Sequence, residues 1–307
     1  MDLLWPVKWL LEFLLVTFHS LFTFLGLGAG DGVTWVLSLI GLVIVVRAAL
    51  IPLFVRQIKS QRGMVLLQPE LQKLQKKYKG KTDRASREAF GREQMELYKR
   101  TGSNPLSSCL PLLAQMPIFF SLYFVINEAQ HSKAGVGFLS VDLATSFANA
   151  TFFGAPMSAT FLNSDVTSTK ILAAVMVALM ISSQFITQRQ IIAKNQTPAN
   201  LQNSQYMQTQ KIMMWLFPVM FIFTGVAFPL GLLFYWTASN FWTMGQQFIV
   251  IRNMPAPGSP AYEARQARLA AKGIRPEGEI IADGDAAPKP EPKGQRQQPS
   301  RKKPKKK

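Results

Sequence analysis

The stretch LIGLVIVVRAALIPLFVRQIK, residues 39–59, places one cation inside a hydrophobic run. Twelve of the thirteen residues that follow Leu39 are apolar or glycine, and the exception is Arg47. A lone guanidinium at membrane depth costs about 3 kcal/mol unless it faces water or a partner. Snorkelling to the headgroups is the simpler interpretation, but in a span over 34–55 Arg47 lies roughly 12 Å from the inner end. We therefore expect Arg47 to face a polar cavity within the membrane.

The composition separates apolar blocks from basic ones. Of the 307 residues 48% are hydrophobic, yet the formal net charge is +17. Apolar blocks of membrane-spanning length alternate with blocks rich in Lys and Arg, which is typical of a polytopic membrane protein. The single cysteine, Cys109, excludes an internal disulfide framework, and the chain has no phosphate-binding G-x-x-x-x-G-K-[ST] sequence. We expect an all-α polytopic membrane protein that is not an enzyme and that needs no cofactor or metal.

The first block, residues 1–30, is apolar but carries Lys8, Glu12 and His19. Glu12 and His19 fall on one helical stripe, and mainly leucine and phenylalanine cover the rest of the helix surface. This pattern favours an amphipathic helix that lies in the interface on the outer side of the membrane. A membrane-spanning helix is the alternative. A cleaved signal peptide does not fit, because the start is acidic and no small-residue cleavage site follows.

The remainder of the chain divides into spans, a charged hairpin and a tail. Residues 56–103 are highly charged and show the three- and four-residue apolar spacing of amphipathic helices, interrupted at Gly80. This pattern predicts a cytoplasmic helical hairpin. The tail, residues 253–307, is rich in proline, glycine and charge, which predicts disorder. The predicted five-span core, residues 34–252, has spans at about 34–55, 105–127, 170–191, 211–228 and 230–251.

The distribution of Lys and Arg predicts the orientation. Thirteen lie in 56–100, two in 187–210 and fourteen from Arg252 onward. The loop 128–169 holds one, Lys133. The positive-inside rule therefore places the hairpin, the short loop and the tail in the cytoplasm. Five spans then put the N-terminus outside and the C-terminus in the cytoplasm.

Uncharged polar and aromatic groups accompany Arg47 in the predicted spans. The span interiors contain no Asp, Glu or His, so a proton relay or cation coupling lacks its usual carrier. Interhelical hydrogen bonds or positions at the membrane interface explain each polar group individually. Together they predict a hydrated groove that is cationic towards the cytoplasm and aromatic towards the outside. The candidates are Gln115, Gln184, Tyr235, Trp236, Thr237, Ser239 and Asn240.

Three segments carry a resemblance to a known family. They read VRAALIPLFVRQIKSQRGMVLLQPELQKLQKKY (46–78), NPLSSCLPLLAQMPIFFSLYFVI (104–126) and FPLGLLFYWTASNFWTMGQQFIVIR (228–252). The chain resembles, over about residues 3–252, the YidC-type membrane protein insertases, which are the bacterial branch of the Oxa/Alb/YidC family. The likeness is to the form without the large outer-side domain of some members.

The resemblance implies a five-span core with a groove that is open to cytoplasm and lipid and closed outside. It implies that Arg47 is the groove arginine, that Gln184 is the groove glutamine, and that Tyr235 and Trp236 contact the client. Gln115 belongs to our candidate client-binding set as well. One departure is Val43, which stands where some members have a polar residue, so the groove is expected to be drier.

The expected activity is insertion and folding of nascent membrane proteins in the bacterial cytoplasmic membrane without ATP. The basic tail predicts attraction to ribosomal RNA or to anionic membrane lipids, and the Sec translocon is a further candidate partner. The alternative is an anion or lipid transporter that uses Arg47 as its binding charge. That alternative requires alternating access, usually built from inverted repeats, and no convincing repeat is visible. A purely structural assembly partner is a third interpretation.

Overall fold

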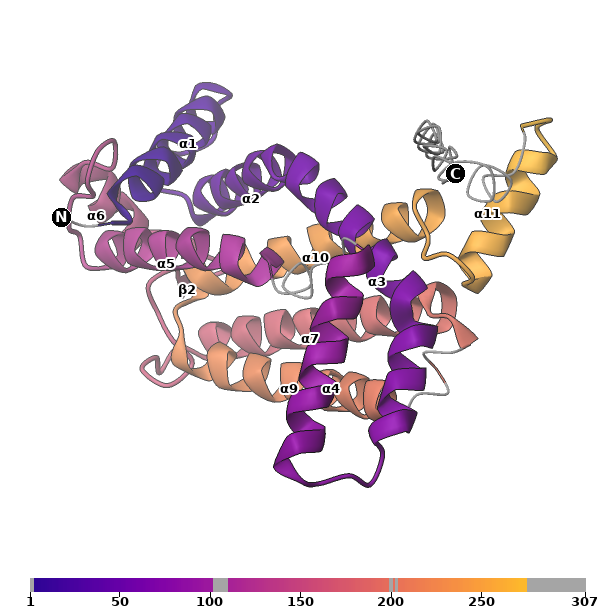
Figure 1. The fold of residues 1–307 in the computed structure, drawn as a ribbon. Coiled ribbons are helices and arrows are strands. Elements are labelled where there is room, and N and C mark those ends of the chain that lie inside the picture. The colour runs from indigo at the N-terminus through magenta and orange to yellow at the C-terminus, as the bar shows by residue number, and fades with distance from the viewer. Residues whose placement is uncertain (1–2, 102–109, 199–200, 202–203, 275–307) are drawn as a thin grey trace, which may run out of the picture. The chain divides into compact units, whose positions relative to one another are not determined.

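The structure is a computed structural model that describes residues 3–101, 110–198, 201 and 204–274. These residues are mostly helical, with one short antiparallel ribbon in which Thr151 pairs with Pro156 and Phe152 with Ala155 (Figure 1). The strands are β1 (Thr151–Phe152) and β2 (Ala155–Pro156). The helices are α1 (Trp5–Phe24), α2 (Gly32–Ala49), α3 (Ile51–Tyr78), α4 (Arg84–Thr101), α5 (Leu110–Gln130), α6 (Val141–Asn149), α7 (Thr167–Asn195), α9 (Ser204–Ala227), α10 (Leu230–Asn253) and α11 (Pro260–Ala270).

Four described helical segments are long and apolar enough to cross a membrane. They are α1, α2, α7 and residues 210–227 of α9. The helix α10 is not among them because it carries tyrosine, threonine, serine, asparagine and glutamine along its length. It packs on both α7 and α2, so protein covers much of its surface, and a helix in that position does not have to be apolar all round. The prediction of a helical membrane protein is confirmed.

The predicted first span, 34–55, is interrupted in the structure. The helix α2 ends at Ala49, and α3 begins at Ile51 and continues without a break to Tyr78. Pro52 explains the interruption, because it has no N–H to continue the ladder and favours the first turn of a new helix. The helix that continues into the hairpin therefore begins at residue 51, five residues before the predicted start of the hairpin at residue 56.

The helices α3 and α4 pair as a hairpin around Gly80, whose φ of +84° lies in the left-handed region that favours glycine. Buried apolar residues, among them Leu67, form the contact between the two helices. Glu93 of α4 accepts hydrogen bonds from Lys77 (2.6 Å) and from the Tyr78 hydroxyl (2.8 Å). Those two bonds, the one from Lys77 above all, lower the pKa of the Glu93 carboxyl. The two hairpin helices are thus held together by the ion pair and hydrogen bond of Glu93 as well as by buried apolar contacts.

The core is organised around α10. Figure 1 shows α7 and α9 side by side on one side of α10, with α1 and α2 on the other. Leu232 and Tyr235 of α10 join the cluster formed with α1, α2, α5 and α6, whereas Leu233 joins the cluster formed with α7 and α9. The first free amides of α10 are satisfied, because Gly231 donates its N–H to the carbonyl of Met157 at 2.9 Å. This anchoring fixes where the polar middle of α10 lies.

Among its described residues the predicted tail contains one helix, α11, whose residues from Glu263 onward belong to a second compact unit. The expectation of a tail without regular structure is therefore wrong for residues 260–270. Pro260 occupies the first helical position, the Ser259 hydroxyl accepts the N–H of Tyr262 at 3.2 Å, and the sequence is rich in good helix formers. Residues 275–307 of the predicted tail lie outside the described residues.

Candidate functional site

A cavity of about 480 Å³ lies among α2, α5, α9 and α10. The helix α2 contributes Arg47, and α5 contributes Gln115 and Phe119. The helix α9 supplies an apolar wall that includes phenylalanine and methionine side chains. Polar side chains reach the cavity mainly from α2, α5 and α10, so one side of it suits a polar group and the other an apolar one.

Arg47 is fixed within the cavity by α10. Its Nε and Nη2 both donate to the Ser239 hydroxyl, at 3.2 Å and 2.5 Å, and Ser239 is only 5% exposed. No aspartate or glutamate lies among the described residues that line the cavity. The guanidinium thus faces a cavity in which no carboxylate of the described lining balances its charge. A buried cation without a counter-charge attracts either water or an anionic group of a ligand.

Aromatic side chains form the wall next to this cation. The Trp236 ring stacks on the Phe119 ring, with centroids 5.5 Å apart and planes 5° apart, and meets the Phe228 ring edge-on at 5.4 Å. The Gln115 side-chain amide donates to the Tyr235 hydroxyl at 3.3 Å. Stacked rings present a large rigid apolar surface. The cavity therefore joins a fixed cation to a rigid aromatic surface.

Four of the five candidate client-binding residues come together here, and one does not. Arg47, Gln115, Tyr235 and Trp236 all line the cavity, whereas Gln184 of α7 is half-buried and is not among the described lining residues. The buried stripe of α7 runs through Ser183 and its neighbours three and four residues away. Gln184 comes one position later and lies at the edge of that stripe, about 40° around the helix from Met180. No described residue of α7 is among those that line the cavity.

Three further polar predictions have mixed outcomes. Ser239 and Asn240 line the cavity, but Thr237 does not, and its hydroxyl is buried without a hydrogen-bond partner in the described part of the chain. Val43, one turn before Arg47, is 2% exposed and belongs to the core. Val43 is not among the described residues that line the cavity, so the drier groove expected from it stays a prediction.

Sequence reasoning missed several lining residues. Thr243 lies seven residues after Trp236, so it continues the same helical face, and this spacing was a usable signal. Thr224 of α9 and Phe119 of α5 also line the cavity, and nothing in the pattern of their own helices distinguishes them from lipid-facing neighbours. Only the packing of the helices selects them.

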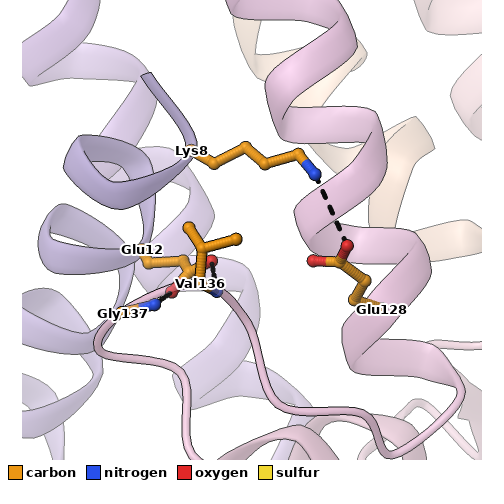
Figure 2. Close-up of polar contacts among 5 residues, drawn as sticks. All are labelled: Lys8, Glu12, Glu128, Val136 and Gly137. Carbon is orange, nitrogen blue, oxygen red and sulfur yellow. Dashed lines mark hydrogen bonds and ion pairs between the residues drawn. The ribbon is translucent and has the colours of Figure 1, made fainter. Parts of the chain in front are cut away.

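A second polar cluster joins α1 to α5 and to the loop after α5 (Figure 2). Glu12 is fully buried and His19 is 3% exposed, so the polar stripe that predicted an interfacial helix faces the protein instead. The outward surface of α1 is apolar and includes Trp9 and Phe13. The stripe is satisfied by protein groups, because Glu12 accepts backbone N–H groups and Lys8 lies 3.5 Å from Glu128.

The chain matches a family model described as 60Kd inner membrane protein over residues 27–257. It is similar to the membrane protein insertase YidC of Tropheryma whipplei strain Twist, with 43% identity over 288 residues that cover 91% of this chain and 93% of that protein. It is also similar to the membrane protein insertase YidC of Bifidobacterium longum strain NCC 2705, with 37% identity over 99% of this chain and 95% of that protein.

One solved structure is also similar. An active YidC insertase crystal structure with the first transmembrane domain resolved shares 25% identity with this chain, with a TM-score of 0.45. The match covers 70% of this chain and 41% of that one, so this chain spans less than half of the length of that protein.

Proposed function

Because the chain belongs to the 60Kd inner membrane protein family and is similar to YidC membrane protein insertases, we propose that the cavity beside Arg47 is its client-binding groove. The protein is a membrane protein insertase of the bacterial cytoplasmic membrane and not an enzyme. Its substrates are accordingly membrane proteins. None of the relatives described above is a transporter, so the transporter alternative has no support.

The observation that carries the proposal is a fixed guanidinium in a cavity whose described lining residues include no carboxylate. A client segment with a short polar flank meets a large cost when the flank crosses hydrocarbon. A hydrated cavity that reaches partway across shortens the apolar barrier, and Arg47 attracts acidic groups in the flank. The hydrophobic part of the client then passes the Trp236 wall into lipid, driven by its own burial and by the membrane potential, without ATP.

We also propose the topology of the membrane-embedded part. It has five spans, formed by α2, α5, α7, α9 and α10, with the N-terminus outside and the α3–α4 hairpin and C-terminus in the cytoplasm. The Lys and Arg counts support this orientation, with thirteen in 56–100 against one in 128–169. Labelling single cysteines at positions 80 and 133 from either side tests it. Label at position 80 from the outer side contradicts the orientation.

Photo-crosslinking to a ribosome-bound nascent membrane protein tests the client-binding proposal. Probes at Tyr235 and Trp236 are expected to crosslink strongly, and a probe at Trp215, which is 70% exposed on α9, serves as the matched aromatic control. A probe at Gln184 decides whether the client path extends to α7. Crosslinking from Trp236 no stronger than from Trp215 contradicts the assignment of the cavity.

Replacing Ser239 with alanine is expected to weaken insertion of clients with acidic outer flanks by roughly tenfold. The serine hydroxyl accepts two N–H bonds from Arg47, and a hydrogen bond to a charged group contributes about 1.5–3 kcal/mol. Insertion is measured by protease protection of the client in proteoliposomes. Ser239→Thr keeps the hydroxyl and is the control, so an equal defect in both variants argues against a role for the hydroxyl bond.

Deleting the chain after Arg252 is expected to weaken ribosome association while leaving the fold intact. Thirteen Lys and Arg follow Arg252, and attraction of such a segment to RNA phosphates falls steeply with salt. Cosedimentation with ribosomes at low and high salt measures the effect. Undiminished cosedimentation of the truncated protein contradicts this part of the proposal. If the deletion weakens binding to anionic vesicles but not to ribosomes, the partner of the tail is lipid.

A further inference from the structure

Two charged side chains of α1 are buried on the side of the helix that faces α5 and the following loop. Lys8 is 6% exposed and Glu12 is fully buried. They lie one turn apart on α1 and extend to the same side, as Figure 2 shows. Burying charged groups is costly unless hydrogen bonds and opposite charges replace water. Neither residue lines the cavity, so the proposed client-binding role does not explain them.

The backbone of the loop after α5 holds the Glu12 carboxylate. One carboxylate oxygen accepts the N–H of Val136 at 2.8 Å, and the other accepts those of Gly137 at 2.8 Å and Leu139 at 3.3 Å. The Gly135 N–H closes this loop onto the Leu139 carbonyl at 2.8 Å. Converging backbone N–H groups form an anion-binding concavity. In this chain an internal carboxylate from α1 fills it.

The loop wraps Glu12 closely enough to require glycine at one position. A Cβ atom placed on Gly135 would overlap Oε1 of Glu12, whereas a Cβ atom on Gly30, in the connection between α1 and α2, would meet no atom within 4 Å. Alanine at position 135 therefore disturbs the carboxylate from the loop side without changing α1. Alanine at position 30 is the matched control.

Lys8 extends the same contact to α5. Its Nζ lies 3.5 Å from Oε1 of Glu128 and 4.8 Å from the centre of the Phe124 ring, and both partners belong to the C-terminal half of α5. The other half of α5 carries Gln115 and Phe119, which line the cavity. Glu128 comes thirteen positions after Gln115, which corresponds to about 20 Å along one continuous helix. A shift at Glu128 is therefore transmitted to the cavity wall.

The packing of α5 makes this attachment important. The helix packs more extensively on α1 and α6 than on α10. Across the cavity it meets α10 through the Phe119–Trp236 ring stack and the hydrogen bond from Gln115 to Tyr235. The position of the α5 wall thus depends mainly on the elements at its C-terminal half.

We propose that Glu12 and Lys8 are positioning residues, which act through the loop and α5 to fix the α5 wall of the cavity opposite α10. The inference rests on the proposed function of that cavity. Glu12 has the larger effect because it accepts three backbone N–H groups. The contact of Lys8 with Glu128 is a single long one, and the second Glu128 oxygen is buried without a hydrogen-bond partner among the described residues.

The test uses the full-length chain in proteoliposomes, with Cys109 replaced by serine. Spin labels are attached at positions 120 and 241, where the native side chains are exposed on α5 and α10. The distribution of the distance between the labels is measured by pulsed electron paramagnetic resonance. Client insertion per folded protein is measured in the same samples. The variants are Glu12→Gln, Gly135→Ala and Lys8→Met, with Gly30→Ala as the control.

The Glu12→Gln variant leaves at least one loop N–H without an acceptor, because the amide nitrogen cannot accept a hydrogen bond. We expect this variant and Gly135→Ala to broaden the distance distribution and to lower insertion at least about fivefold, because functional sites tolerate shifts of only about 1 Å. Lys8→Met is expected to broaden the distance distribution and lower insertion to a smaller extent, and Gly30→Ala is expected to change neither quantity. If Glu12→Gln does not fold, Gly135→Ala and Lys8→Met carry the test.

Insertion that falls without a change in the distances, or distances that broaden without a change in insertion, overturns the positioning role. Arg47→Ala separates this outcome from failure of the proposed function. It is expected to reduce insertion of acidic-flank clients by tenfold or more while leaving the label distances unchanged. If Arg47→Ala inserts those clients normally, the assignment of the cavity fails, whatever the Glu12 variants show.

Discussion

Replacing Arg47 with alanine is expected to reduce insertion of clients with acidic outer flanks by tenfold or more. A unit charge pair 4 Å apart is worth about 1 kcal/mol in water and about 4 kcal/mol near a protein surface, and about 1.4 kcal/mol corresponds to tenfold. The attraction between Arg47 and an acidic group in the cavity lies between these two energies, because Arg47 is half-buried. No carboxylate among the described lining residues competes for the guanidinium. The measurement is protease protection of the client in proteoliposomes at fixed insertase concentration.

Two control variants test whether the loss comes from removing the positive charge at this particular position. Arg47→Lys keeps the charge and is expected to retain most of the activity, and Arg56→Ala removes an exposed cation that does not line the cavity. A client with a neutral flank is expected to be less affected by Arg47→Ala. Equal loss from Arg47→Lys and Arg47→Ala points instead to the fork geometry with which the guanidinium bonds to Ser239.

The second large effect is expected from replacing Trp35 with alanine. Trp35 of α2 is 0% exposed, and its ring stacks on that of His19 at 4.0 Å and meets the Phe147 ring edge-on at 5.3 Å. Truncating a buried tryptophan to alanine costs about 3–5 kcal/mol. We expect the thermal unfolding midpoint in lipid nanodiscs to fall by roughly 10 °C.

Trp215 provides the matched control for this substitution. It is 70% exposed on α9, so Trp215→Ala is expected to leave the midpoint nearly unchanged. Trp35→Phe keeps an aromatic ring but loses the hydrogen bond to the Ser146 hydroxyl, and we expect it to cost about 1 kcal/mol. Similar midpoints for Trp35→Ala and Trp215→Ala would contradict the view that α1, α2 and α6 are joined through Trp35.

Much of the site was visible in the sequence because depth in a membrane makes polar groups conspicuous. Arg47 stood out against an apolar run, and Tyr235, Trp236 and Ser239 fall within two turns of one helix, which the 3.6-residue period brings close to one face. Gln184 was predicted from its polarity within an apolar span and from the resemblance, and it is not among the described residues that line the cavity. The described lining residues come from α2, α5, α9, α10 and Phe228, and none from α7, so the packing of the helices and not the sequence of α7 decides that Gln184 lies outside the lining.

The N-terminal helix shows the opposite case. Its sequence contains a polar stripe with Glu12 and His19, and that stripe predicts amphipathicity without saying what covers the polar face. The partners of Glu12 lie 124 to 127 residues away in the chain. Every residue except proline has a backbone N–H, so the sequence of residues 135–139 could not predict that this loop binds a carboxylate.

The sequence by itself determined the helical class, the alternation of apolar and basic blocks and the presence of a cation at membrane depth. Hydrocarbon forces each spanning segment to satisfy its own backbone, so the apolar length and charge of each segment are local properties that can be read along the chain. Only the tertiary structure decided that Ser239 fixes Arg47, that α5 and α9 complete the cavity, and that Glu12 is bound by a loop. These contacts join residues distant in the chain, and packing selects them among many sequences with the same local pattern.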